Sequence, residues 1–147
     1  MSAASNTITG KTGSNIARHL ADMARMQPSR PAVICASGRD AAGAATYSQL
    51  TFRDLEESSN QLATALDAVG IRRGVRTALM VPPGLDFFAL TFALFKVGAV
   101  PVLIDPGIGL TQLRGCLAHA RPEAFVGITK AHAARVILGW ADRKSVV

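Results

Sequence analysis

The sequence predicts an α/β fold with a mainly parallel sheet and helices on both of its faces. Residues 75–81 and 100–104 are apolar runs rich in β-branched residues. A break at 82–84 and a helix-length apolar segment at 85–97 lie between them. Two strands joined by a helix lie parallel, and alternating strand and helix units are typical of the α/β class.

The segment 85–97 is apolar on every side. Its apolar residues are Leu85, Phe87, Phe88, Leu90, Phe92, Ala93, Leu94, Phe95 and Val97. A helix without a polar stripe needs cover all round, so we expect a core helix buried on nearly all sides. Asp86 in the first turn and Lys96 in the last suit the helix dipole, and Gly98 suits a C-terminal cap. A membrane span takes about 20 apolar residues, so this segment is too short to be one.

The first 50 residues predict one helix and a hairpin-like pair of strands. The expected elements are a flexible lead-in (1–13), a helix capped by Ser14 or Asn15, a strand (32–36), a loop (37–46) and a returning strand (47–50). The helix carries Ile16, Leu20, Met23 and Met26 on one face. It ends at the proline-containing segment 27–31, because a residue before proline avoids the helical region.

An amphipathic surface helix follows. Thr51 offers a hydroxyl cap, and Asp54 three residues later gives a weaker form of the capping box. Leu55, Leu62, Leu66 and Val69 recur at helical spacing, whereas Arg53, Glu56, Glu57, Asn60, Gln61 and Asp67 form the opposite, solvent-facing side. Gly70 ends this helix, and a strand at 76–81 comes next.

The alternation continues to the end of the sequence. The expected elements are a loop (107–109), a helix capped by Thr111, a strand (124–128) and a helix from Thr129 or Lys130 to Trp140. We expect no further strand, so the chain looks interrupted at Val147. The predicted division is a lead-in (1–13), one unit (14–142) and a tail (143–147), for which an out-of-frame origin stays open.

Composition favours one cytoplasmic domain. The chain has 147 residues, 49% of them hydrophobic, and a net charge of +6. Its basic residues are scattered, and no aromatic residues interleave with them, so we expect no nucleic-acid partner. The arginines concerned are Arg18, Arg25, Arg30, Arg39, Arg53, Arg72, Arg73, Arg76, Arg114, Arg121 and Arg135. Cys35 and Cys116 make no disulfide framework, and no signal peptide is visible, which favours the reducing cytoplasm.

Two phosphate-binding patterns can be excluded. Gly107-Ile108-Gly109 follows a predicted strand, but a dinucleotide fingerprint needs a third glycine where this chain has Gln112. Asp105-Pro106 also occupies the turn that the phosphate would need. The sequence lacks a P-loop, which needs Gly, four residues and then Gly-Lys-Ser/Thr.

The other reactive residues do not converge. Cys116 and His119 lie one helical turn apart and could share a metal, but a half-buried thiol and a surface histidine are the favoured interpretation. The remaining candidate ligands, His19, His132 and Cys35, are far away in the sequence. Asp86 is better explained as a dipole partner than as a base, and no Gly-x-Ser-x-Gly elbow exists. The residues alone therefore indicate no catalytic, cofactor-binding or metal site.

Several segments resemble the N-terminal region of AMP-forming adenylate synthetases, the superfamily of acyl-CoA synthetases, luciferases and peptide-synthetase adenylation domains. The segments are LTFRDL (50–55), NQLA (60–63), GIRRGVR (70–76) and the stretch from Phe87 to the KVGAVPV turn (96–102). IDPGIG (104–109) and PEAFVGITKAH (122–132) are similar to the branch that makes β-lactones from β-hydroxy acids in bacterial olefin biosynthesis. The resemblance covers residues 16–140.

The resemblance implies an N-terminal subdomain of an enzyme that uses ATP and Mg to convert a carboxylic acid into an acyl-adenylate. A β-lactone or a CoA thioester would follow. Gly74-Val75-Arg76 and Pro82-Pro83-Gly84 depart from the family's Gly-Asp-Arg and Pro-Asn-Ser. The family's phosphate loop, adenine motif, ribose-binding aspartate and C-terminal lysine map onto no residue here. The resemblance thus implies no catalytic residue in this chain, and no ATP or Mg bound by it alone.

The resemblance also implies that sequence absent here covers the apolar helix 85–97. We therefore expect an exposed apolar face that meets either the remainder of the enzyme or a second copy. Two other functions stay open: a small stand-alone nucleotide-binding module and a non-enzymatic interaction protein.

Overall fold

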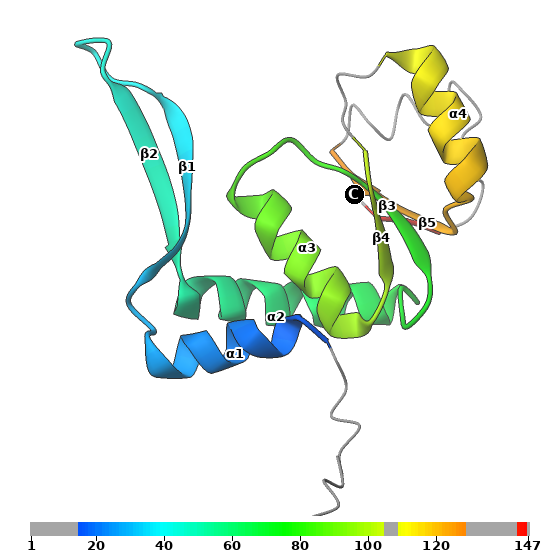
Figure 1. Cartoon of the computed structure of the whole chain (residues 1–147), viewed down its shortest axis with the longest axis horizontal. Helices are drawn as coiled ribbons and strands as arrows, with labels where there is room; N and C mark the ends of the chain where they lie inside the picture. Colours follow the sequence, from blue (N-terminus) through cyan, green and yellow to red (C-terminus); the bar gives the residue numbers. More distant parts are fainter. Residues whose placement is uncertain (1–14, 105–108, 129–143, 147) are drawn as a thin grey trace, which may run out of the picture.

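The computed structural model describes residues 15–104, 109–128 and 144–146. The elements are α1 (Ala17–Met26), β1 (Pro31–Arg39), β2 (Ala45–Thr51), α2 (Phe52–Ala68), β3 (Arg76–Met80), α3 (Leu85–Val97), β4 (Val100–Leu103), α4 (Leu110–Ala120), β5 (Ala124–Gly127) and β6 (Lys144–Val146). The strands form a β1–β2 hairpin and a four-stranded sheet of order β4-β3-β5-β6 (Figure 1).

The four-stranded sheet is parallel throughout. In its middle, Ala78 of β3 lies opposite Val102 of β4 and Phe125 of β5. Helix α3 has the bounds expected from the sequence and ends at Gly98, which adopts the left-handed conformation with φ 73°. The predicted α/β class and the predicted strand–helix–strand unit are both confirmed.

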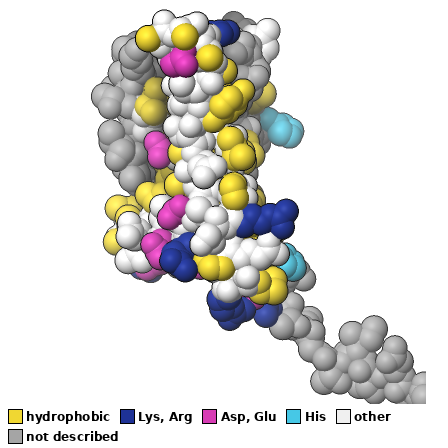
Figure 2. Space-filling view, turned by 90° about the vertical axis from the view of Figure 1, so that its left-hand side faces the viewer, with side chains coloured by type: hydrophobic (Ala, Val, Ile, Leu, Met, Phe, Trp, Pro, Cys, Tyr) yellow, Lys and Arg dark blue, Asp and Glu magenta, His cyan; other side chains and the backbone are white. Residues whose placement is uncertain are grey.

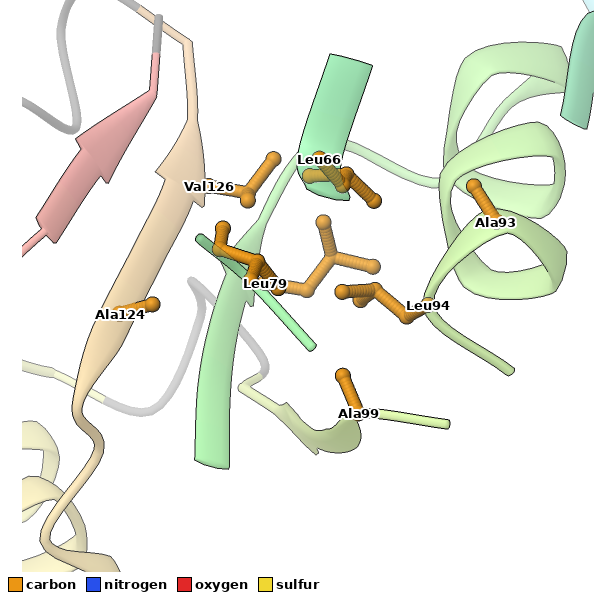
Figure 3. Packing of buried hydrophobic residues seen from close by; sticks show 8 residues of the cluster. Leu66, Leu79, Ala93, Leu94, Ala99, Ala124 and Val126 are labelled. Carbon is orange, nitrogen blue, oxygen red and sulfur yellow. The ribbon is translucent and has the colours of Figure 1, made fainter. Parts of the chain in front are cut away.

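Helices cover both faces of this sheet, because successive residues of a strand point to opposite sides. Leu79 packs on the side of α2 and α3, and its neighbour Ala78 packs on the side of α4. The first cluster consists of Leu66, Ile71, Leu79, Ala93, Leu94, Ala99, Ala124 and Val126 (Figure 3). The second consists of Ala78, Leu113, Leu117 and Phe125. Burial on both faces explains why the consecutive residues Ala78, Leu79 and Met80 of β3 are all apolar rather than alternating with polar ones.

Pro101 lies in the strand at one edge of this sheet. The N–H of Val100 donates to the carbonyl of Val75 at 2.9 Å, so the nitrogen of the next residue, Pro101, is directed away from β3. Proline cannot donate to a ladder and is tolerated in a strand only at such a position. Pro101 therefore fits the edge strand β4 and discourages the pairing of another strand there.

The hairpin stands apart from the sheet, and α3 lies between the two (Figure 1). Its strands are longer than expected, since Arg39 still pairs with Ala45, and only residues 40–44 form the turn. The side chain of Asp40 shapes this turn by accepting the N–H groups of Ala42 and Ala44, both at 2.9 Å. Local side-chain bonding of this kind is typical of Asp in turns.

The caps of α1 and α2 follow from their sequences. Asn15 Oδ1 accepts the N–H of Ala17 at 3.0 Å, so one of the two candidate caps of α1 contributes. At α2 the capping box is complete: Thr51 Oγ1 accepts the Asp54 N–H at 3.2 Å, and Asp54 Oδ2 accepts the Thr51 N–H at 3.0 Å. The expectation of a capping box is confirmed.

The prediction that α3 is buried on nearly all sides is wrong for the described chain. Only Ala89, Ala93 and Leu94 are buried, and Phe88 is 36% exposed. The face of α3 that carries Phe88 points toward α1 and the hairpin, which cover it only in part. Apolar character in every direction therefore does not ensure cover in every direction.

Three smaller expectations also need correction. Helix α4 begins at Leu110 with Gly109 as its N-cap, so Thr111 lies inside the helix rather than capping it. Residues 144–146 form β6, which pairs with β5 as a further parallel strand. Cys116 is exposed rather than half-buried. The helix expected from 129 or 130 to 140 lies outside the described residues.

Candidate functional site

The carboxyl edge of the sheet is the first place to examine, because ligands of open α/β sheets bind outside the carboxyl ends of the strands. Strands β3, β4 and β5 end at Met80, Leu103 and Gly127. The described residues that follow them are 81–84, Ile104 and Ile128, none of which has an ionisable side chain. This described part of the edge offers backbone and apolar groups, but no acid, base or nucleophile.

Of the two glycines considered for dinucleotide binding, only Gly109 lies among the described residues. Gly107 lies outside the described residues, and Gly109 has φ 75° at the start of α4. A Cβ at Gly109 would lie 3.3 Å from Oε1 of Gln112, the residue that stands where a fingerprint needs its third glycine. A side chain therefore occupies the helix start that a pyrophosphate would need to approach.

The metal hypothesis for α4 finds no support in the geometry. Cys116 and His119 are both exposed on the helix. Within residues 15–104, 109–128 and 144–146, no three His, Cys, Asp or Glu side chains come together as possible ligands. Asp86 is exposed in the first turn of α3, which agrees with the dipole interpretation.

An apolar groove lies where α1 meets the hairpin, α2 and α3, with a volume of about 280 Å³. It is lined by Ile16, His19, Leu20, Met23, Ala32, Val33, Phe52, Leu55, Phe88 and Phe92. His19 is the only ionisable residue among them. Ile16 is 56% exposed and Phe88 36% exposed, so the groove opens to solvent. Such a lining can receive an apolar group but has no constellation for chemistry.

A polar cluster that the sequence did not suggest joins α2 and α3. The ammonium of Lys96 donates to Glu56 Oε2, Ser59 Oγ and Asn60 Oδ1, each at 2.8 Å, and to the carbonyl of Glu56 at 3.1 Å. The side chains of Lys96 and Glu56 are only 13% and 19% exposed. The expected place on the solvent face of α2 is confirmed for Asn60, which is exposed, and is wrong for Glu56, which is part-buried. Their spacing of four residues, with Ser59 between, was the available signal, since residues at i, i+3 and i+4 share a helix face.

The pKa of Asp54 is held below its ordinary value. The main cause is the hydrogen bond from the Thr51 side chain, followed by the one from the Thr51 backbone N–H. Both bonds favour the charged carboxylate. Because they belong to the capping box, the shift is explained by helix structure and does not indicate a catalytic acid.

Basic side chains do not gather on the face that carries the hairpin. In Figure 2, Lys and Arg side chains on this face are separated by polar and hydrophobic surface. None of the helices in the described ranges has the length and apolar character needed to cross a bilayer.

A model of the family described as "AMP-binding enzyme" matches residues 20–147, which is most of the chain. The chain belongs to this family. It is 50% identical over 129 residues to the olefin β-lactone synthetase of Stenotrophomonas maltophilia, which is 86% of this chain and 23% of that protein. It is 48% identical over 128 residues to the protein of the same name from Xanthomonas campestris pv. campestris, again 86% of this chain and 23% of the relative.

The fold has close counterparts among solved structures. The N-terminal subdomain of Klebsiella oxytoca NpsA superposes with a TM-score of 0.67 at 19% identity, over 77% of this chain and 27% of that chain. At that identity the likeness shows the fold alone. The resemblance inferred from the sequence motifs is confirmed for the family, and so is the similarity to olefin β-lactone synthetases. The chain spans about a quarter of the length of these curated relatives.

Proposed function

We propose that this chain forms the N-terminal portion of an ATP-dependent ligase that activates a carboxylic acid as an acyl-adenylate. The single observation that carries the proposal is the 50% identity to an olefin β-lactone synthetase over 129 residues. By the resemblance, the substrate is a β-hydroxy acid, or another fatty acid, and ring closure to a β-lactone is favoured over transfer to CoA.

The described residues by themselves do not fit an ATP–Mg site. They hold no set of carboxylates for a cation and no glycine loop of the P-loop type. ATP and Mg would therefore be bound by residues outside the described part. The contribution of residues 15–128 is the first part of the parallel sheet with its covering helices, together with the apolar groove.

We also propose a cytoplasmic location, since Cys35 and Cys116 are free cysteines, as suits a reducing compartment. The partner of the open apolar surface stays a prediction, with the remainder of a longer enzyme or a second copy as the two alternatives.

A segment exchange tests the ligase proposal. The matching 129 residues of the Stenotrophomonas maltophilia synthetase are replaced by those of this chain, and ATP-dependent pyrophosphate release is measured with a β-hydroxy acid. The matched control is the same exchange made with the segment of the Xanthomonas campestris protein. That protein has the same name as the host, and this chain is 50% and 48% identical to the two. We expect pyrophosphate release within about tenfold of the control, a loss of about 1.4 kcal/mol or less in transition-state stabilisation.

Mass spectrometry then identifies the product, with CoA present and absent. A product lighter than the acid by one water supports the β-lactone, and a CoA adduct supports the thioester. A folded exchange protein that releases no pyrophosphate, beside an active control, would contradict the ligase proposal. Saturable ATP binding by the 147-residue chain alone would favour the stand-alone nucleotide-binding module instead.

A further inference from the structure

Helix α3 poses a problem of orientation. Hydrophobic burial is non-directional, so a helix that is apolar on every side gains similar burial in several rotations about its axis. Yet in the structure α3 has one definite orientation. Ala93 and Leu94 pack in the sheet cluster, whereas Ala89 and Phe92 pack with Leu55 in the cluster beside the groove. Bonds to the backbone hold the C-terminal end of α3: Asn15 Nδ2 donates to the Phe95 carbonyl at 2.6 Å, and the Gly74 N–H donates to the Gly98 carbonyl at 2.9 Å. The side chains of α3 that make directional contacts are further candidates for selecting its rotation.

The polar side chains of α3 are Asp86, Thr91 and Lys96. Asp86 is exposed, and Thr91 Oγ1 bonds within the helix, to the carbonyl of Phe87 at 2.7 Å. Among the described residues, Lys96 is therefore the α3 side chain that makes directional polar bonds to another element. All of its bonds go to α2.

The hydrogen-bond acceptors around Lys96 are arranged to bind one ammonium group. Glu56 precedes Ser59 and Asn60 by one turn of α2, so the ammonium is held by two successive turns. Ser59 is fully buried, and its hydroxyl donates to the carbonyl of Leu55 at 2.6 Å, which leaves its oxygen free to accept from Lys96. An ammonium has three donors directed from one point, which suits acceptors gathered around it.

We propose that Lys96 is a positioning residue that selects the rotation of α3 on α2 and so places Phe88 and Phe92 in the apolar groove. A different rotation would move Lys96 away from Glu56 and leave the part-buried Glu56 carboxylate without its cation. Buried polar groups that select register at little gain in stability are known from coiled coils. The proposal is independent of the ligase activity.

The test uses the 147-residue chain and two variants. K96M removes the charge and leaves the part-buried Glu56 carboxylate without its cation. The double variant E56L–K96M replaces the whole pair by apolar side chains, which often costs no stability. R114M, which removes an exposed cation on α4, is the matched control. Stability is measured by denaturant unfolding, and the rotation of α3 by NMR contacts between the Phe92 ring and the methyl groups of Leu20 and Leu55.

We expect K96M to raise the unfolded-to-folded ratio roughly a hundredfold or more and R114M to leave it nearly unchanged. The double variant should recover most of the stability but lose the packing of the Phe92 ring against the cluster that contains Leu20 and Leu55, or show it for only part of the molecules. If the pair only stabilised the fold, a double variant that recovers the stability would also recover the contacts of Phe92.

Either of two results for the double variant overturns the proposal. Contacts of Phe92 at wild-type strength would mean that packing alone selects the rotation. Failure to fold would mean that the pair is needed for stability rather than for orientation. Since neither readout involves a substrate, an inactive segment exchange would count against the ligase proposal and leave this one to be judged separately.

Discussion

The two sides of α3 differ in how completely they are covered. Toward the sheet, Ala93 and Leu94 have no exposed surface and Leu79 is 1% exposed. Toward the hairpin and α1, Phe88 is 36% exposed. On the hairpin, Ile34 is 61% exposed. The same helix thus borders a closed core and an open apolar surface.

The difference follows from how each region is built. In a parallel sheet, every crossover brings a helix that covers one face, so the core closes as the strands are added. A two-stranded hairpin brings no such cover, and an isolated pair of strands is marginally stable at best. The apolar surface at the groove would be covered only by a further element, whereas the sheet is already covered by its own crossover helices.

The largest expected change in unfolding free energy distinguishes the closed core from the hairpin. We expect L94A to destabilise the chain by about 2–5 kcal/mol, because it opens a cavity among fully buried side chains. The matched truncation I34A, on the hairpin, should stay within about 0.5 kcal/mol. Urea unfolding of both variants measures the difference, and similar losses would mean that the hairpin is buried in solution, for example against a second copy.

Two glycines with positive φ allow the core and the hairpin to be compared by substitutions that strain the backbone. Gly98, with φ 73°, ends α3, and Gly43, with φ 83°, lies in the hairpin turn. Adding a Cβ in the left-handed region costs roughly 1–2 kcal/mol. We expect this full cost for G98A, since its carbonyl also accepts the N–H of Gly74 at 2.9 Å.

For G43A we expect a smaller loss, because a Cβ there would meet nothing within 4 Å and the turn can relax. Thermal unfolding of the two variants supplies the measurement. A loss for G43A as large as that for G98A would show that the hairpin turn is as rigid as the core.

The capping box joins the two regions, since Thr51 ends β2 and Asp54 belongs to α2. We expect T51A to cost about 1 kcal/mol of unfolding free energy. Because folding lowers the pKa of Asp54, its contribution is present above its ordinary pKa of 3.8 and is lost as pH falls through the lowered value. The stability of D54N should therefore approach that of the wild type in acid, and a gap that stays constant with pH would exclude this linkage.

The smallest change in stability is expected at the groove. The chain should bind a hydrophobic dye, and I16S should reduce the fluorescence while changing stability by no more than about 0.5 kcal/mol. M26S is the control, since Met26 is 68% exposed on α1 but does not line the groove. Equal losses of fluorescence in both variants, or no dye binding by the wild type, would rule out the groove as the open site.

Local signals predicted most of the fold. The bounds of α3, its Gly98 cap and the Thr51–Asp54 capping box follow from neighbouring residues, so they could be inferred from the sequence. The added strand β6 could not, because three residues carry too little pattern to distinguish a strand from a tail. For the candidate site, the sequence motifs pointed correctly to the family, and the absence of catalytic residues from this chain stays a prediction.

The sequence by itself determined the alternation of strands and helices, the family and the apolar character of α3, because each depends on residues close together along the chain. Only the tertiary structure decided that Lys96 meets Glu56, 40 residues away, and that one side of α3 stays open. Both outcomes depend on how α2 and α3 are rotated against each other. The apolar residues of α3 lie on every side of the helix and do not encode that rotation, so it depends on contacts with other elements.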